Sequence, residues 1–172
     1  RRLLAAPDPA PAVAAMQASG VLGAILPGAD ARALPVLVHL ETGLVDPDWI
    51  RRLAVTRPQD ATSALRLSRD EARRLDALHL ALEQGEAPAV LGYRLGADAG
   101  RDVILLRAAL GGGARPEGWQ AAVVEGAGAV FPVKATDLMP AFAGEALGRH
   151  LKTLETRWIT SGFQLSREQL LA

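Results

Sequence analysis

The sequence predicts an all-α protein, built as an array of roughly eight to ten short helices. Helix-capping residues and prolines stand before apolar segments along the whole chain, as they do where helices begin. The alternation of apolar and polar residues that marks half-buried strands is almost absent. Of the 172 residues, 49% are hydrophobic and 22% are charged, which is the composition of an ordered globular protein.

Acidic residues and prolines predict the helix starts in the first third of the chain. Asp8-Pro9 and Asp46-Pro47 each place a capping acid before a proline. A proline is accepted in the first helical turn because its missing N–H would have no partner there. Pro35 should occupy the same kind of position in a third helix, within residues 30–44.

A capping box predicts the start of the next helix. Ser68 and Glu71 have the spacing at which each side chain accepts a hydrogen bond from the backbone N–H of the other residue. The residues that follow at helical spacing, and that should form a buried stripe, are Leu75, Leu78 and Leu82. Segments 89–96 and 100–112 continue the array as helices, and a glycine run ends the second one.

A flexible link is predicted at residues 111–118, which read GGGARPEG. Glycine and proline interrupt regular structure most strongly, so this segment is the weakest joint in the chain. It divides the protein into a helical body over residues 1–112 and a smaller helical tail over residues 113–172.

The tail should contain two helices before the C-terminal end, the second of which is the last long helix of the chain. Residues 117–130 predict a helix with a frayed, glycine-containing end, and VFPVK after it predicts a connector because Pro132 cannot donate to a strand ladder. The last long helix begins near Gly144 and Gly148. Its buried side is expected to consist of Leu147, Leu151, Leu154 and Trp158, with Arg149 and Lys152 on the opposite side. Ser166 and Gln169 repeat the capping box.

The overall charge and composition exclude several classes of site and partner. The 19 basic residues equal the 19 acidic residues, so any basic surface that binds nucleic acid must be local. The chain has no cysteine, which excludes disulfides and thiolate zinc sites. No apolar run approaches the roughly 20 residues of a membrane span, so no membrane partner is expected and the cytoplasm is the default location.

No catalytic or metal-binding pattern is recognisable. His39, His79 and His150 are far apart in sequence, and His39 and His79 lie in apolar helical text, where partly buried structural histidines are expected. The glycine-rich segments lack the Lys-Ser/Thr end of a phosphate loop, and no serine has the setting of a nucleophile elbow. Paired acids occur only at helix starts, where the helix dipole accounts for them.

Arginines and glycines are the residues that suggest binding. Arg66, Arg69, Arg73 and Arg74 surround one helix start, and Arg51 and Arg52 form a second pair. They predict either solvated helix faces or patches that contact phosphates. Gly144 and Gly148 each cost about 0.5–1 kcal/mol in a helix relative to alanine. Either another helix, the commoner cause, or a phosphodiester backbone would approach them closely.

The C-terminal text resembles the end of the family of CCA-adding tRNA nucleotidyltransferases and bacterial poly(A) polymerases. The resemblance is carried by FPVKATDL, then GEALGRHLKTLETRWI, then SGFQLSREQLL. Upstream, LLAAPDPAPAVAAMQASGVLGAILP and LRLSRDEARRL are similar to the family's helical RNA-binding region. Two positions depart from the family pattern: Ala135 stands where glycine is usual, and Glu145 where proline is frequent.

The resemblance implies an RNA-binding C-terminal portion that positions tRNA or another RNA for nucleotide addition at its 3′ end. The catalytic head, with its Mg²⁺ and its CTP or ATP, is expected outside this chain but in the same protein, so the chain alone should hold no catalytic centre. Both CCA addition and poly(A) addition remain open. The residues expected to bind RNA are Lys134, Gly144, Gly148, Arg149 and Lys152, together with Arg66, Arg69 and Arg73.

A different class of function is the alternative. The chain could be a helical protein-interaction module that uses an apolar groove and has no RNA role. Salt separates the two hypotheses, because binding to phosphates weakens steeply with added salt and binding in an apolar groove does not.

Overall fold

The protein is described by a computed structural model that covers residues 1–139 and 141–172. These residues form twelve helices and no strand, and 63% of them are helical, which confirms the predicted all-α fold. Eight of the helices have seven residues or more, and the other four are single turns.

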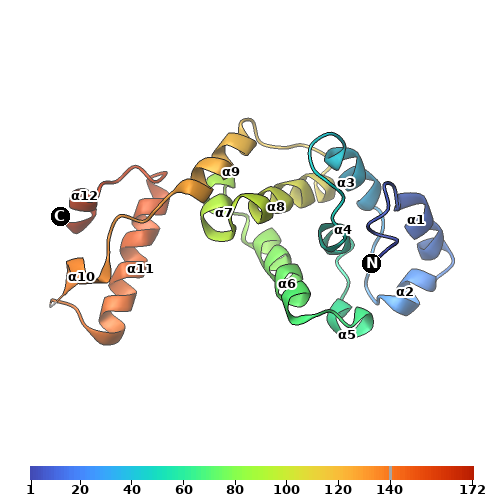
Figure 1. The fold of residues 1–172 in the computed structure, drawn as a ribbon, viewed down its shortest axis with the longest axis horizontal. Coiled ribbons are helices and arrows are strands. Elements are labelled where there is room, and N and C mark those ends of the chain that lie inside the picture. The colour runs from blue at the N-terminus through green and yellow to red at the C-terminus, as the bar shows by residue number, and fades with distance from the viewer. Residues whose placement is uncertain (140) are drawn as a thin grey trace.

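Figure 1 shows a larger body formed by the first nine helices and a smaller tail at the C-terminal end. In chain order the helices are α1 (Ala10–Ala18), α2 (Val21–Ile25), α3 (Leu34–Glu41), α4 (Trp49–Val55), α5 (Ala61–Leu65), α6 (Arg69–Gln84), α7 (Pro88–Leu95), α8 (Ala97–Leu110), α9 (Trp119–Gly128), α10 (Ala135–Leu138), α11 (Gly144–Thr160) and α12 (Arg167–Leu171).

The two predicted capping boxes form, whereas the two helices predicted from Asp-Pro pairs begin later than expected: α1 begins at Ala10, and its N-cap residue, Pro9, makes no side-chain hydrogen bond. Ser68 and Glu71 make the expected capping box at the start of α6, and Ser166 and Gln169 make a second one before α12. The start of α4 is shifted by two residues, because Asp48 and not Asp46 accepts the hydrogen bond from the backbone N–H of Arg51, at 2.8 Å.

Two separate hydrophobic clusters hold the body and the tail. The body cluster includes Trp119 and Val123 of α9, which are both buried. The tail cluster is built on Val133, Leu138, Leu154, Trp158 and Leu170. The hydrophobic core therefore changes after α9, although the sequence placed the body–tail boundary at residue 112. The reason is that α9 buries its apolar side on the body.

Two glycines allow α7 and α9 to touch backbone to backbone. A Cβ atom on Gly126 of α9 would lie 1.8 Å from the carbonyl oxygen of Ala89, and one on Gly92 of α7 would lie 2.0 Å from that of Val123. Gly126 therefore belongs to a packed contact, whereas the sequence suggested a frayed helix end. The contact has no room for any side chain larger than hydrogen.

A buried cluster of charges joins four helices of the body. Glu41 of α3 accepts hydrogen bonds from Arg51 and Arg52 of α4, both at 2.7 Å. Asp102 of α8 accepts from Arg51 at 2.6 Å and from Arg74 of α6 at 2.9 Å. We call these five residues the buried ion cluster; four of them are buried, and Arg74 closes the cluster at the surface with its side chain 41% exposed.

Arg51 and Arg52 are therefore neither solvated nor available to phosphates, which corrects the sequence-based interpretation of this pair. Arg51 is 3% exposed and Arg52 is 1% exposed. The guanidinium group of Arg52 also donates to the carbonyl oxygens of Leu4, Ala6 and Pro7. The arginine thereby fixes the N-terminal segment, which has no regular structure of its own, against the body.

Replacing Arg52 by methionine should lower the free energy of unfolding by about 3–5 kcal/mol, because the carboxylate of Glu41 would lose a partner without gaining access to water. Arg69→Met is the matched control: Arg69 is exposed, so its loss should change stability by less than about 0.5 kcal/mol. Chemical denaturation of the two variants measures the difference. Equal stability of both would contradict the structural role of the cluster.

Gly126→Ala should cost about 1–3 kcal/mol or more, because its methyl group would collide with the backbone of α7 and no rotamer can relieve that contact. Gly128→Ala provides the control in the same helix. No atom lies within 4 Å of a Cβ atom built there, so alanine should be neutral or slightly stabilising. Thermal unfolding of both variants tests the pair, and a neutral Gly126→Ala would argue against the close contact.

Candidate nucleic-acid interface

The longest helix of the tail, α11, carries four of the eight residues predicted to bind RNA: Gly144, Gly148, Arg149 and Lys152. Its buried side is the predicted one. Leu154 and Trp158 are buried, and Leu147 and Leu151 pack against them from the preceding turns. Arg149 and Lys152 are exposed, as expected for the opposite side.

The two glycines of α11 have different explanations. Gly144 has a φ of +54°, a conformation that favours glycine over residues with a side chain. Gly148 has an ordinary helical conformation, and no atom lies within 4 Å of a Cβ atom built on it. Packing against another helix, the commoner cause considered from the sequence, therefore does not account for either glycine within the described part of the chain.

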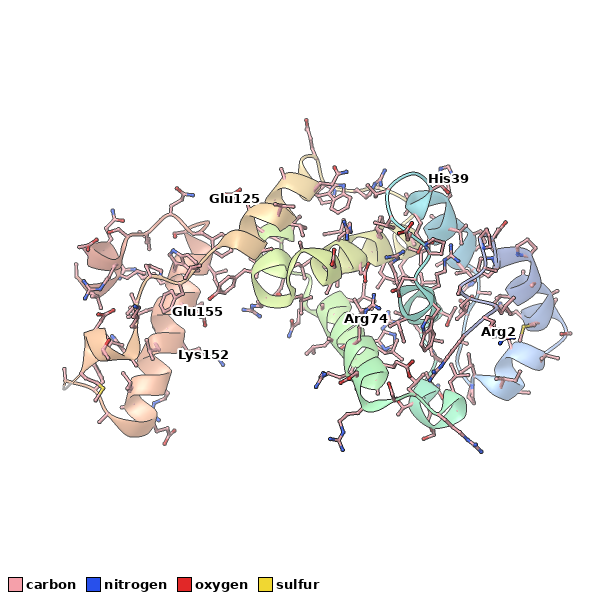
Figure 2. The ribbon with its side chains drawn as sticks, viewed as in Figure 1. Arg2, His39, Arg74, Glu125, Lys152 and Glu155 are labelled. Carbon is pink, nitrogen blue, oxygen red and sulfur yellow. The ribbon has the colours of Figure 1, made fainter. Side chains whose placement is uncertain are left out.

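Gly148, Lys152 and Glu155 share one side of α11, since they are spaced four and three residues apart. We call this side the inner flank. Glu155 accepts a hydrogen bond at 2.5 Å from the hydroxyl group of Tyr93, which belongs to α7 of the body. Figure 2 shows Lys152 and Glu155 on the side of α11 that is turned toward the body. The inner flank therefore faces the body, and at Gly148 it is uncovered.

Tyr93 also anchors the tail through its ring. The ring lies edge-on to Trp158, with centroids 5.5 Å apart, and tilted against Phe163 at 5.6 Å. Burial, together with the hydrogen bond to Glu155, raises the pKa of Tyr93 to about 12. Sequence reasoning missed this joint, because residues 93 and 155 are far apart in the chain and neither lies in a recognisable motif.

The remaining predicted residues do not join the inner flank. Lys134 precedes α10, which lies on the side of α11 away from the body (Figure 1). Arg149 forms an ion pair with Glu145 on the solvent side of α11. Lys152, in contrast, has no ion-pair partner among the described residues.

The predicted arginines of the body form a separate group at the start of α6. Arg66 ends α5 with a φ of +49°, and Arg73 is paired with Asp70 at 2.5 Å. Arg69 is exposed beside them. The same face of α6 continues with exposed Asp76 and Glu83, so its charge is mixed. Arg74, the fourth arginine of the sequence cluster, turns inward and bonds to Asp48 and Asp102.

The three histidines lie in three different environments. The prediction for His79 is confirmed: it is half-buried, and its Nε2 lies 3.2 Å from the carbonyl oxygen of Ala54. The prediction for His39 is wrong, because this side chain is on the outer side of α3 and exposed. His150 stacks on Phe142 in the tail.

The described residues contain no group of three or more His, Cys, Asp or Glu side chains that could hold a metal ion. In the same residues no helix combines the length and the apolar character needed to cross a membrane.

Comparison of the chain with models of protein families, with curated proteins and with solved structures finds no match.

The only tyrosine of the chain permits a direct test of the body–tail joint. In the folded protein the phenolate should form with a midpoint near pH 12, as followed by ultraviolet absorbance, and in denaturant the midpoint should return to about 10. Because the folded pKa is the higher one, the stabilisation is complete below pH 10 and is lost as the pH rises toward 12.

The variant Glu155→Gln should lower the midpoint of the folded protein, since it removes the negative charge beside the phenol but leaves the ring buried. Glu145→Gln, on the solvent side of the same helix, is the control and should leave the midpoint unchanged. A midpoint near 10 in the folded wild-type protein would show that Tyr93 is not held in this joint.

Proposed function

We propose that this chain is the RNA-binding part of a nucleotidyltransferase and positions tRNA or another RNA for nucleotide addition at its 3′ end by a separate catalytic unit. The observation that carries the proposal is the uncovered inner flank of α11. There, Lys152, which has no ion-pair partner among the described residues, lies one helical turn after Gly148, where none of their atoms lies within 4 Å of a Cβ atom built on the glycine.

A phosphodiester backbone fits this surface for two physical reasons. Phosphate oxygens attract an ammonium group without requiring a fixed geometry, so Lys152 can contribute one phosphate contact. A missing side chain at Gly148 lets the sugar–phosphate backbone approach the helix more closely than any other residue would allow. Contacts of this kind position an RNA and do not read its sequence.

The start of α11 offers further donors. Its N-cap residue, Ala143, makes no side-chain hydrogen bond to the first turn, so N–H groups at this end of the helix lack a capping partner from a side chain. The N-terminus of a helix attracts anions through these groups and through the helix dipole. Glu145 in the first turn opposes this attraction but is paired with Arg149.

The body contributes to the proposed RNA-binding surface by holding α11 in position through Tyr93. The arginines at the start of α6 supply a second basic group. Arg66 and Arg69 are its members best placed for phosphate contact, because both are exposed and neither makes an ion pair among the described residues. Mg²⁺ and the nucleotide substrates belong, in this proposal, to the catalytic unit.

A protein-interaction module is the second candidate. Val124 at 65% exposure and Val130 at 80% exposure leave apolar surface open on and after α9. A protein partner could cover this surface, and its binding would depend little on salt.

The test is a titration of the chain with tRNA at several salt concentrations. Lys152→Ala should weaken binding and reduce the slope of log affinity against log salt by roughly 0.7–0.9, the contribution of one phosphate contact. Arg115→Ala, which removes an exposed charge from the loop before α9, is the control and should leave the slope unchanged.

Gly148→Leu tests the close approach of the RNA backbone. Among the described residues no atom lies within 4 Å of a Cβ atom at Gly148, and leucine is the better helix former, so folding should be retained while tRNA binding is lost. Gly128→Leu, at another open glycine position, should not affect binding. If neither Lys152→Ala nor Gly148→Leu changes the affinity for tRNA, or if the affinity does not depend on salt, the proposal is rejected in favour of the protein-interaction module.

A further inference from the structure

A cavity of about 400 Å³ lies among α10, α11 and α12, within the tail. These three helices lie at the end of the molecule away from the body (Figure 1). The side chains that matter for binding are an apolar group of Leu138, Leu154 and Leu170, and a polar or aromatic group of Phe142, His150 and Arg157. Its volume falls in the range of roughly 300–1,000 Å³ found for small-molecule sites.

The cavity is separate from the inner flank of α11. Arg157 and Lys152 are five residues apart, so their side chains lie on different sides of the helix. A variant in one site therefore leaves the other site in place.

A stacked pair of rings forms one part of the cavity wall. The centroids of Phe142 and His150 lie 4.3 Å apart, and the two ring planes differ by only 11°. Both side chains are half-buried, so the pair retains surface that a further planar group can cover. Bases of single-stranded RNA bind proteins by stacking on such side chains, with little dependence on sequence.

The unsatisfied charge at the cavity is positive. Arg157 is exposed and has no ion-pair partner among the described residues. Asp137, the one acidic side chain among the described residues that line the cavity, is already engaged. It accepts a hydrogen bond from Arg167 at 2.8 Å and another from the backbone N–H of Lys134 at 2.8 Å. A ligand that combines a planar ring with an anionic group therefore complements the cavity.

We infer that this tail cavity is a site for one unpaired nucleotide of the bound RNA, with its base against Phe142 and His150 and its phosphate on Arg157. The inference rests on the proposed RNA-binding function and adds a partner to it, an unstacked nucleotide in a single-stranded segment. The leucines that line the cavity exclude water from the base, and Arg157 supplies a charge-assisted hydrogen bond to the phosphate.

The NMR signals of the three histidines report whether a nucleotide binds in the tail cavity. Adenosine 5′-monophosphate and a short 5′-phosphorylated oligoadenylate are titrated into the full chain while the imidazole signals are followed by NMR. The signal of His150 should shift and saturate with both probes. The signals of His39 and His79, which lie in the body, should not move and serve as internal controls.

Arg157→Gln should weaken binding of both probes by roughly tenfold, the effect of one hydrogen bond to a charged group. Arg115→Gln is the matched control and should bind as the wild type does. Phe142→Leu keeps the wall apolar but removes the stacked ring, and it should weaken binding roughly fivefold or more. Ribose 5-phosphate, which lacks a base, should bind far more weakly than the nucleotide.

The outcomes separate this inference from the proposed function. If tRNA binding depends on Lys152 but His150 does not respond to either probe, the RNA-binding function stands and the nucleotide site is rejected. If the mononucleotide shifts His150 and the oligonucleotide does not, the assignment to RNA is overturned. Saturable binding of both probes that Arg157→Gln weakens and Arg115→Gln does not would establish the site.

Discussion

The buried ion cluster is the interaction on which the body depends. Glu41 and Asp102 bring Arg51, Arg52 and Arg74 together, and these five residues come from α3, α4, α6 and α8. A buried charge is costly unless it is paired, so each member fixes the positions of the others. Because Arg52 also holds the N-terminal segment, one set of ion pairs orders residues from the start of the chain as far as α8.

Helix α7 connects the body to the tail. Gly92 brings α7 into backbone contact with α9, and the next residue, Tyr93, leaves the body and enters the aromatic cluster of the tail. Two adjacent residues of α7 therefore make two different contacts. Gly92 contacts α9 because it has no side chain, and Tyr93 contacts the tail through its large ring. The inner flank of α11 faces the body because of this arrangement.

Local signals in the sequence predicted the fold, whereas long-range pairing decided the sites. The capping boxes at Ser68 and Ser166 could be predicted because donor and acceptor lie three residues apart. The burial of Arg51 could not, since its partner Asp102 lies in a helix that only the tertiary structure brings close. The sequence held a weak signal, because arginines and acidic residues within otherwise apolar helical segments indicate buried ion pairs. For α11, the period of the apolar residues predicted which side is buried, but not that the joint with Tyr93 turns one flank toward the body.

The contact between Tyr93 and α11 lies near the C-terminal end of the helix, far from its glycine-containing start. Tyr93 meets α11 at Glu155 and Trp158, whereas the glycine head of the helix begins at Gly144, eleven residues before Glu155. At 1.5 Å per residue this distance is roughly 16 Å, so a rotation of about 10° at the joint would displace the helix head by about 3 Å. A displacement of that size equals the length of a hydrogen bond. The packing of Tyr93 thus determines how precisely the start of α11, several helical turns away, is positioned.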